Sequence, residues 1–305
     1  MSVKKFEHRV LSVIKRSQLW RPDECVTLAV SGGVDSMVML DVLAQTQLSH
    51  RANLQVVTFD HGFRSESVAE VQFVHQACQT YDIPCVIHSL NLSDGPRKQE
   101  RSRDARRDFL SQFDGLIATA HHASDQAETV LFRMLRGSGL DGLKGMSARS
   151  GSWVKPLLME FKGTIVQYAN ERHLKWKEDP SNLTSTRGTI RQLWSDLERV
   201  HSNPEKSMAK VATMLSRDAE CLDEIAAQMM PTVLCNNHIA VERLRSLHSA
   251  IQSRILRYWL WGNGIDIRNQ QIELLLNWKP SRNGARIQLQ SDVYVLQSGA
   301  KWVLC

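Results

Sequence analysis

The stretch CVTLAVSGGVDSMVMLDVLAQ, residues 25–45, decides the fold. It begins with a short apolar run rich in β-branched residues, CVTLAV, of the kind that forms a buried parallel strand. The small residues of SGGVDS follow at 31–36, and from Met37 the sequence has a helical pattern. A strand, a glycine turn and a helix in this order predict an α/β unit with a ligand-binding loop at the carboxyl end of the strand.

The same alternation continues over the first 125 residues. Apolar runs recur as LQVVTF at 54–59, CVIHSL at 85–90 and LIATA at 116–120, and a helical pattern follows each of them. We therefore predict an α/β fold, a parallel sheet with helices on both faces.

The strand rhythm stops after residue 162, and from residue 204 the composition is helical. We place a domain boundary there, which predicts a catalytic domain at 1–203 and a smaller α-rich domain at 204–305. Strand-like runs, ARIQLQ at 285–290 and VYVLQS at 293–298, close the second domain.

Length and composition agree with this division. A chain of 305 residues suits two domains, and 42% hydrophobic with 23% charged residues is typical of a globular protein. No segment approaches the roughly 20 apolar residues of a membrane helix, and the N-terminus has no uninterrupted apolar core of a secretory signal. We expect a cytoplasmic protein with no membrane partner.

Charge and cysteine content narrow the classes further. The six cysteines contain no CxxC pair, which argues against a zinc site and a thioredoxin-like motif. A net charge of +6 permits a polyanionic partner such as nucleic acid. The sequence leaves open whether the chain forms a homodimer.

The turn at 31–36 is the first candidate site. Two glycines let the backbone approach an oxyanion, serine hydroxyls can donate, and the helix N-terminus points N–H groups at the same place. The expected phosphate-binding residues are Ser31, Gly32, Gly33, Val34, Asp35 and Ser36. The alternative is a plain glycine turn in which Asp35 and Ser36 only cap the helix.

The loop is not a Walker A loop, because GxxxxGK[ST] would supply a lysine for the β and γ phosphates and this loop has none. A carboxylate beside phosphate is repulsive unless a divalent cation lies between them. Asp35 therefore predicts that the ligand is ATP with Mg²⁺.

Further candidates follow the later strands. Asp125 and Glu128 share one face of a predicted helix, so both carboxylates could bind an ammonium group of a substrate. The alternative is that they only complement the helix macrodipole. His121 and His122 follow LIATA and point to opposite sides of an extended chain, so one of them, for which we choose His121, could face the nucleotide while the other is structural. Asp60 ends the second strand as a candidate nucleotide contact, and the alternative there is a turn made by His61 and Gly62.

Basic residues form two more candidate groups. Arg103, Arg106 and Arg107 share a helical face that suits pyrophosphate or RNA phosphate, although most charge runs are solvated helix faces. Arg187 and Arg191 could hold a phosphate or a substrate carboxylate, or could be an exposed pair at a helix start.

Taken together, these motifs resemble a known family. SGGVDS is similar to the PP-loop of N-type ATP pyrophosphatases, which have the adenine nucleotide alpha hydrolase-like fold. The later motifs follow the order found in tRNA(Ile)-lysidine synthetases, in the short form without an extra C-terminal domain. They are FDHGFRSES at 59–67, RSRDARRDF at 101–109, AHHASDQAET at 120–129, RGSGLDGLKGM at 136–146, KPLL at 155–158 and EDPSN at 178–182.

The resemblance implies a ligase that forms a carbon–nitrogen bond. ATP adenylates the wobble cytidine in the CAU anticodon of tRNA(Ile), and free L-lysine then displaces AMP to give lysidine. The implied catalytic residues are Asp35, Asp125, Glu128 and Arg103, and Asp35 and Asp125 are the implied Mg²⁺ ligands. Asp60, His121 and Arg191 join the loop as implied nucleotide contacts, and the domain at 204–305 is expected to recognise the tRNA.

Three positions depart from the family pattern. Ser124 stands where a second aspartate is usual, Lys155 replaces the arginine of RPLL, and Gly188 replaces an asparagine. Two other readings stay open: tRNA thiolation, which the absence of CxxC disfavours, and a non-catalytic nucleotide-binding or tRNA-binding protein, which the intact SGGVDS, Asp125 and Glu128 disfavour.

Overall fold

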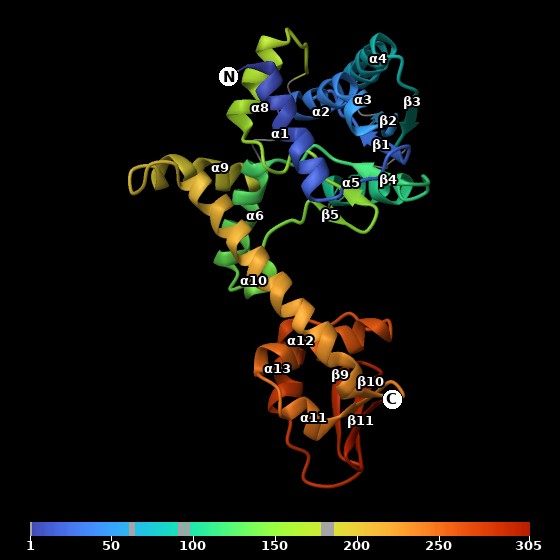
Figure 1. Ribbon diagram of the computed structural model, residues 1–305, viewed down its shortest axis with the longest axis vertical. Helices are drawn as coiled ribbons and strands as arrows, with labels where there is room; N and C mark the ends of the chain where they lie inside the picture. The colour runs from blue at the N-terminus through green and yellow to red at the C-terminus, as the bar shows by residue number, and fades with distance from the viewer. Residues whose placement is uncertain (1, 61–64, 91–94, 96–97, 178–185) are drawn as a thin grey trace. The chain divides into compact units, whose positions relative to one another are not determined.

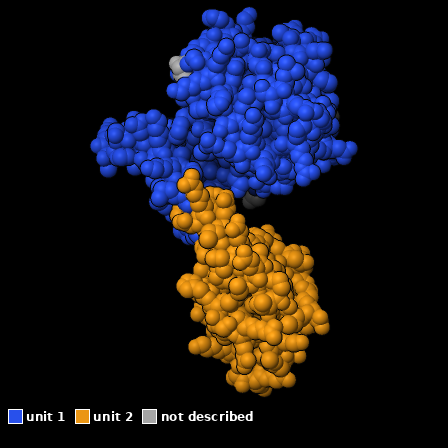
Figure 2. All heavy atoms as spheres, in the orientation of Figure 1, with its two compact units in different colours: residues 1–214 blue, residues 215–305 orange. Residues whose placement is uncertain are grey.

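A computed structural model describes residues 2–60, 65–90, 95, 98–177 and 186–305 (Figure 1). The chain forms two compact units, residues 1–214 and 215–305 (Figure 2). The division falls inside α10 (Pro204–Val233), a continuous helix that begins where the sequence placed the domain boundary. Since one helix carries the chain from the first unit into the second, the boundary at residue 203 stays a prediction.

The first unit is built on a parallel sheet with the strand order β3-β2-β1-β4-β6-β5, in which only β5 runs antiparallel. Its strands are β1 (Cys25–Ala29), β2 (Asn53–Asp60), β3 (Cys85–Ser89), β4 (Leu116–Ala118), β5 (Arg149–Ser150) and β6 (Trp153–Val154). The chain moves outward from β1 to β2 and β3, then crosses back so that β4 pairs with the other edge of β1. The carboxyl ends of β1 and β4 therefore flank a topological switch point, where ligands bind in open α/β sheets.

Helices cover both faces of this sheet, which confirms the predicted fold class. They are α1 (Val3–Arg16), α2 (Val34–Gln45), α3 (Gln47–His50), α4 (Ser65–Thr80), α5 (Lys98–Leu110), α6 (Ala123–Leu135), α7 (Leu140–Leu143), α8 (Lys162–Glu171) and α9 (Thr186–Leu197). Successive strand residues point to opposite faces. Val56 accordingly joins a core with α1, α2, α4 and α8, whereas Val57 packs with Leu110 of α5.

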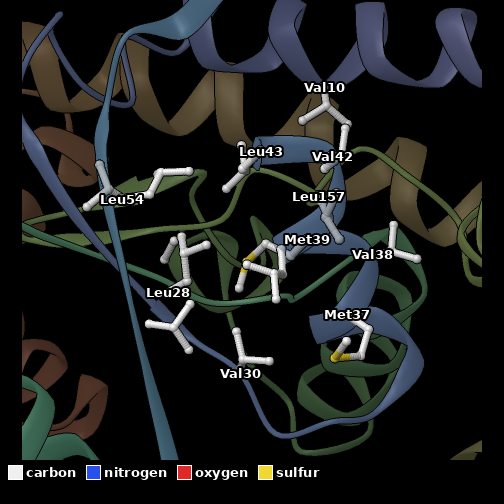
Figure 3. Close-up of a cluster of buried hydrophobic side chains, with 14 of the residues drawn as sticks. Val10, Leu28, Val30, Met37, Val38, Met39, Val42, Leu43, Leu54 and Leu157 are labelled. Carbon is white, nitrogen blue, oxygen red and sulfur yellow. The ribbon is translucent and has the colours of Figure 1, made fainter. Parts of the chain in front are cut away.

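The larger of these cores holds α2 against the sheet. Figure 3 shows Leu28 of β1, Met39 and Val42 of α2, Val10 of α1 and Leu157, which belong to one cluster of buried side chains. Each of these five side chains is fully buried. Because α2 is apolar on nearly every side, it can only lie between the sheet and other helices, and this fixes the loop at its N-terminus.

One detail of the sequence interpretation was wrong. The apolar pattern suggested a helix from Met37, but α2 begins at Val34, with Gly33 as its N-cap. Gly33 has extended φ and ψ angles, and the three residues after it already have helical geometry. Val34, Asp35 and Ser36 thus form the first turn of α2.

The second unit contains helices and an antiparallel sheet. Its helices after α10 are α11 (Val241–Arg245), α12 (Ser249–Gly262) and α13 (Asn269–Asn277). Its strands follow the order β7-β8-β11-β10-β9, where β7 is Leu234–Cys235, β8 His238–Ala240, β9 Arg286–Gln290, β10 Val293–Ser298 and β11 Lys301–Leu304. The strand-like runs in the sequence correspond to β9 and β10. Trp259 and Trp302 are the largest side chains buried in its core.

Within the described residues, the helices are too short or too polar to cross a lipid bilayer.

Candidate phosphate-loop site

The loop after β1 has the geometry of an anion-binding turn. Gly32 has a φ of +84°, which a side chain would strain, and Gly33 leads directly into α2. The Ser36 hydroxyl donates to the Gly33 carbonyl at 2.9 Å and accepts from the Ser31 N–H at 3.2 Å. These bonds hold the loop closed around the first turn of α2, whose N–H groups have no intrahelical partner.

Asp35 lies in that first turn and forms an ion pair that the sequence did not reveal. The ammonium of Lys162 lies 2.7 Å from Asp35 Oδ1 and 2.8 Å from Oδ2. The two residues are 127 positions apart, and they meet because α8 packs on α2. A phosphate loop that has no lysine of its own therefore has a lysine ammonium beside it.

His122 joins Asp35 to the start of α6. As the N-cap of α6, its Nδ1 accepts from the Asp125 N–H at 3.3 Å, while Asp125 Oδ2 accepts from the His122 N–H at 3.0 Å. When Nδ1 accepts, the proton of a neutral ring is on Nε2. That nitrogen lies 3.5 Å from Asp35 Oδ1, so His122 presents an N–H toward the carboxylate of Asp35.

The capping box gives Asp125 a structural role at the start of α6. Asp125 is buried, and so is Glu128 one turn later, which is 3% exposed. A buried carboxylate is costly unless it is bonded, so the two positions are not ordinary surface acids. Their roles in chemistry stay predictions.

Ser124 also has a structural role here. Its hydroxyl accepts from the backbone N–H of Lys162 at 3.1 Å, and the Ala123 N–H donates to the Glu160 carbonyl at 2.8 Å. The carboxylate of Glu160 is held in turn by Arg9, whose Nε lies 2.7 Å from Oε1. The start of α8 is therefore fixed to the start of α6.

As a result, the first turns of α2, α6 and α8 meet at the switch point between β1 and β4. Each helix N-terminus carries about half a positive charge. An anion placed among these helix ends would face partial positive charge from each of them, in addition to the Lys162 ammonium.

A loop that follows α6 is fastened to that helix. Gln126 Nε2 donates to the Met146 carbonyl at 2.8 Å, and Arg133 Nη1 donates to the Gly142 carbonyl at 2.8 Å. The motifs at 120–129 and 136–146 are thus joined by hydrogen bonds between α6 and the segment that follows it.

The other sequence candidates lie around this centre or away from it. Asp60 ends β2, next to β1, and is half-buried at the same edge of the sheet. His121 Nδ1 lies 2.9 Å from the hydroxyl of Thr119. His61 lies outside the described residues, and so do the side chains of Arg187 and Arg191, although both arginines lie within α9.

The structure does not bring Arg103 to this centre. Arg103 is exposed on α5, which packs on the opposite face of the sheet from α2 and α8. Arg106 is more enclosed, and burial together with the charge of Arg103 lowers its pKa. Within the described contacts, neither side chain touches Asp35, His122 or Asp125. The part of Arg103 in catalysis stays a prediction.

Mg²⁺ suits the groups that are present. In the described part of the chain, His, Cys, Asp and Glu side chains form no cluster of three that could enclose a metal ion. Mg²⁺ on a nucleotide does not need such a cluster, because it takes one or two carboxylates together with phosphate oxygens and water. Asp35 already holds a cation beside the phosphate loop, so its position fits that chemistry.

Lys162 was not among the functional residues predicted from the sequence, although one feature of the sequence pointed to it. A lysine at the first position of a helix opposes the macrodipole, and α8 has no acidic residue in its first turn. Such a local conflict is typical of functional positions.

The fold and this centre define a class: α/β nucleotide-binding domains in which a phosphate loop without a Walker lysine lies at the switch point of a parallel sheet. Comparison with known families gives the same answer, since residues 3–196 match the PP-loop domain. The chain belongs to the PP-loop domain family.

Individual relatives agree. The chain is 34% identical over 195 residues to the tRNA(Ile)-lysidine synthase of Thermosipho africanus, which covers 60% of this chain and 46% of the relative. It is 29% identical over 282 residues to that of Pseudomonas putida, covering 83% and 66%, and 33% identical over 263 residues to that of Pseudomonas aeruginosa, covering 79% and 60%. The chain thus spans about half to two thirds of the length of these relatives.

Among solved structures, the U34-tRNA thiolase NcsA from Methanococcus maripaludis has a similar fold. The TM-score is 0.57 at 19% identity, covering 70% of this chain and 80% of the other. At this identity the likeness concerns the fold alone.

Proposed function

We propose that this protein is a tRNA(Ile)-lysidine synthetase, a ligase that uses ATP to join free L-lysine to the wobble cytidine of the CAU anticodon. The cytidine O2 attacks the α-phosphorus of ATP and pyrophosphate leaves. The ε-amine of lysine then attacks C2, and AMP leaves with the former O2. The products are lysidine in tRNA(Ile), AMP and pyrophosphate.

The observation that carries the proposal is the meeting of Asp35, Lys162 and the His122–Asp125 pair at the switch point. In this arrangement a phosphate loop, a lysine ammonium and the buried carboxylate of Asp125 lie in one place on a PP-loop domain. Adenylation needs little covalent catalysis, because positioned charges that stabilise the phosphorus-centred transition state are enough. Similarity to tRNA(Ile)-lysidine synthases over up to 83% of the chain supports the choice within the family.

Mg²⁺, when bound, would neutralise charge on the phosphates and polarise them toward attack. Asp35 is the residue that would hold it, and Asp125 is the second candidate. The loop N–H groups would hold the phosphates in line, while Asp125 and Glu128 would receive the amino groups of lysine.

We infer that residues 204–305 recognise the tRNA. In the second unit, all of which is described, Arg245, Lys279 and Arg282 line a surface hollow of about 430 Å³ that has no acidic residue in its lining. Residues 204–305 have twelve lysines and arginines against nine aspartates and glutamates. Such a balance favours contact with a phosphate backbone.

The test is incubation of the purified protein with Mg²⁺, ATP, radiolabelled lysine and bulk bacterial tRNA. Label that stays in the tRNA after mild alkali is expected, because alkali removes only an ordinary aminoacyl ester. ATP binding without stable label would contradict the proposal and favour tRNA thiolation or a non-catalytic role.

A further inference from the structure

We propose that Lys162 supplies the phosphate-contacting lysine that the loop itself lacks. Its ammonium neutralises Asp35 in this structure, and when a nucleotide with Mg²⁺ binds it moves to the polyphosphate. The inference rests on the proposed function only for the identity of the nucleotide.

The ammonium of Lys162 lies beside the phosphate loop. Lys162 Nζ lies within 2.8 Å of both carboxylate oxygens of Asp35, a residue of the first turn after the loop. Ser31 to Ser36 surround the start of the same helix. An ammonium that reaches this carboxylate also reaches an anion seated on the loop.

The backbone of Lys162 is held independently of Asp35. Its N–H donates to Ser124 Oγ at 3.1 Å, and α8 packs against α1 and α2. A buried network adds to this: Asp41 of α2 accepts from the hydroxyl of Tyr168 at 2.6 Å and from Arg172 Nη2 at 3.0 Å. The side chain can therefore change partner while its helix stays in place.

The Lys162–Asp35 pair is more exposed to solvent than the ion pair of Asp41. The side chain of Lys162 is 45% exposed and that of Asp35 is 30% exposed, whereas the ion pair of Asp41 has a carboxylate that is only 1% exposed. An ion pair open to solvent is weak and exchanges readily. The Lys162–Asp35 pair can thus be opened by a ligand, while the Asp41 pair is part of the scaffold.

The charge of the Lys162 ammonium needs a new partner when Mg²⁺ binds Asp35. Mg²⁺ takes carboxylate and phosphate oxygens, so its arrival at Asp35 leaves the ammonium without its anion. The polyphosphate brings negative charge to the same place. A lysine then gains a charge-assisted hydrogen bond to phosphate in exchange for the lost one to carboxylate.

The experiment measures nucleotide binding without tRNA or lysine, so its outcome does not depend on lysidine formation. Affinities for ATP and AMP are compared in the full chain and in Lys162→Met, with Lys15→Met as control, since Lys15 is an exposed lysine at the end of α1. We expect Lys162→Met to weaken ATP binding about 10- to 100-fold, the worth of one charge-assisted bond. AMP binding and the control should change little, and Lys162→Arg should restore most of the ATP affinity.

A second comparison excludes the simpler role of a counter-ion for Asp35. In EDTA, ATP affinity is measured for Asp35→Asn and for the double variant Asp35→Asn with Lys162→Met. A phosphate contact gives a further loss of about tenfold or more in the double variant. Equal affinity of the two variants, with melting temperatures showing that both are folded, would overturn the proposal.

Discussion

Gly32 shows how much of the site depends on single backbone angles. Its φ of +84° lies in the left-handed region, while the space around its Cα would admit a methyl group, with Val74 Cγ2 at 3.5 Å. The requirement for glycine is therefore conformational and not steric. The loop closes around the start of α2 only if this angle is kept.

We expect Gly32→Ala to cost about 1–2 kcal/mol of folding free energy through backbone strain and to weaken ATP binding as the loop opens. The matched control is Gly151→Ala, since Gly151 also has a positive φ, with open space around it, and lies far along the chain in the β5–β6 turn. Urea unfolding and ATP titration would measure the two effects. An equal loss of ATP affinity in both variants would show that the loop angle has no special role.

The surroundings of Cys85 lower the pKa of its thiol. A hydrogen bond from the Cys78 thiol, together with the nearby His75, lowers the pKa of Cys85 to about 6 despite partial burial. The same contact, together with burial, raises the pKa of Cys78. The thiolate is the reactive form, so a lowered pKa makes Cys85 reactive at a lower pH.

The rate of alkylation by iodoacetamide at Cys85 should therefore rise between about pH 5 and 7 and level off above that range, as expected for a pKa near 6. Mass spectrometry of digests would give the rate at each cysteine, and Cys78→Ala, which removes the hydrogen-bond donor, tests the cause. In that variant we expect the rise to move to higher pH. A wild-type rate that rises only above pH 8 would show that the Cys78 contact does not stabilise the thiolate.

At the scale of elements, the pairing of α2 with α8 depends on a buried carboxylate. Asp41 accepts hydrogen bonds from Tyr81, Tyr168 and Arg172, and it is fully buried. Its contacts join α2, the turn after α4 and the end of α8. These are the helices that bring Asp35 and Lys162 together.

Asp41→Ala should lower the free energy of unfolding by about 3–5 kcal/mol, because it leaves the guanidinium of Arg172 without its buried partner. Asp23→Ala is the control, because Asp23 and Arg51 form an exposed pair that is worth about 1 kcal/mol or less. Chemical denaturation measures both. Similar losses in the two variants would mean that the Asp41 network does not hold α2 to α8.

Local sequence predicted the elements better than it predicted their partners. The apolar runs that became β1, β2 and β4 were visible because buried parallel strands are continuous and apolar, and the run CVIHSL, which became β3, was visible from its Val and Ile although its side chains are half-buried or exposed. The start of α2 was misplaced because backbone angles after Gly33, and not hydrophobicity, begin that helix. Lys162 was missed because its partner lies 127 residues away, and only the packing of α8 on α2 brings the two together.

The second unit shows the same limit. β9 and β10 were recognisable as strand-like runs, whereas β7 and β8 have two and three residues, pair with each other across the turn at Asn236 and Asn237, and join the sheet through β11. Runs this short have no periodicity to detect. The sequence therefore described this part as helical and did not predict its sheet.

At the scale of the whole molecule, we expect substitutions in the second unit to weaken tRNA binding without changing ATP binding. Lys279→Glu with Arg282→Glu reverses two charges at the basic hollow of the second unit. We expect weaker tRNA binding, a shallower dependence of affinity on salt by roughly one unit per lost phosphate contact, and unchanged ATP affinity. Arg217→Glu, an exposed site on α10, is the control for charge alone. If the control weakens tRNA binding as much, the hollow has no special part in recognition.

The most direct measurement is mass spectrometry of tRNA(Ile) carrying a CAU anticodon after incubation with the protein, Mg²⁺, ATP and lysine. Nuclease digestion would locate the modified nucleoside. We expect lysine on the wobble cytidine, no product when that cytidine is replaced by uridine, and little product with Asp35→Asn. An unmodified wobble cytidine, in a protein preparation that binds both ATP and the tRNA, would contradict the assignment.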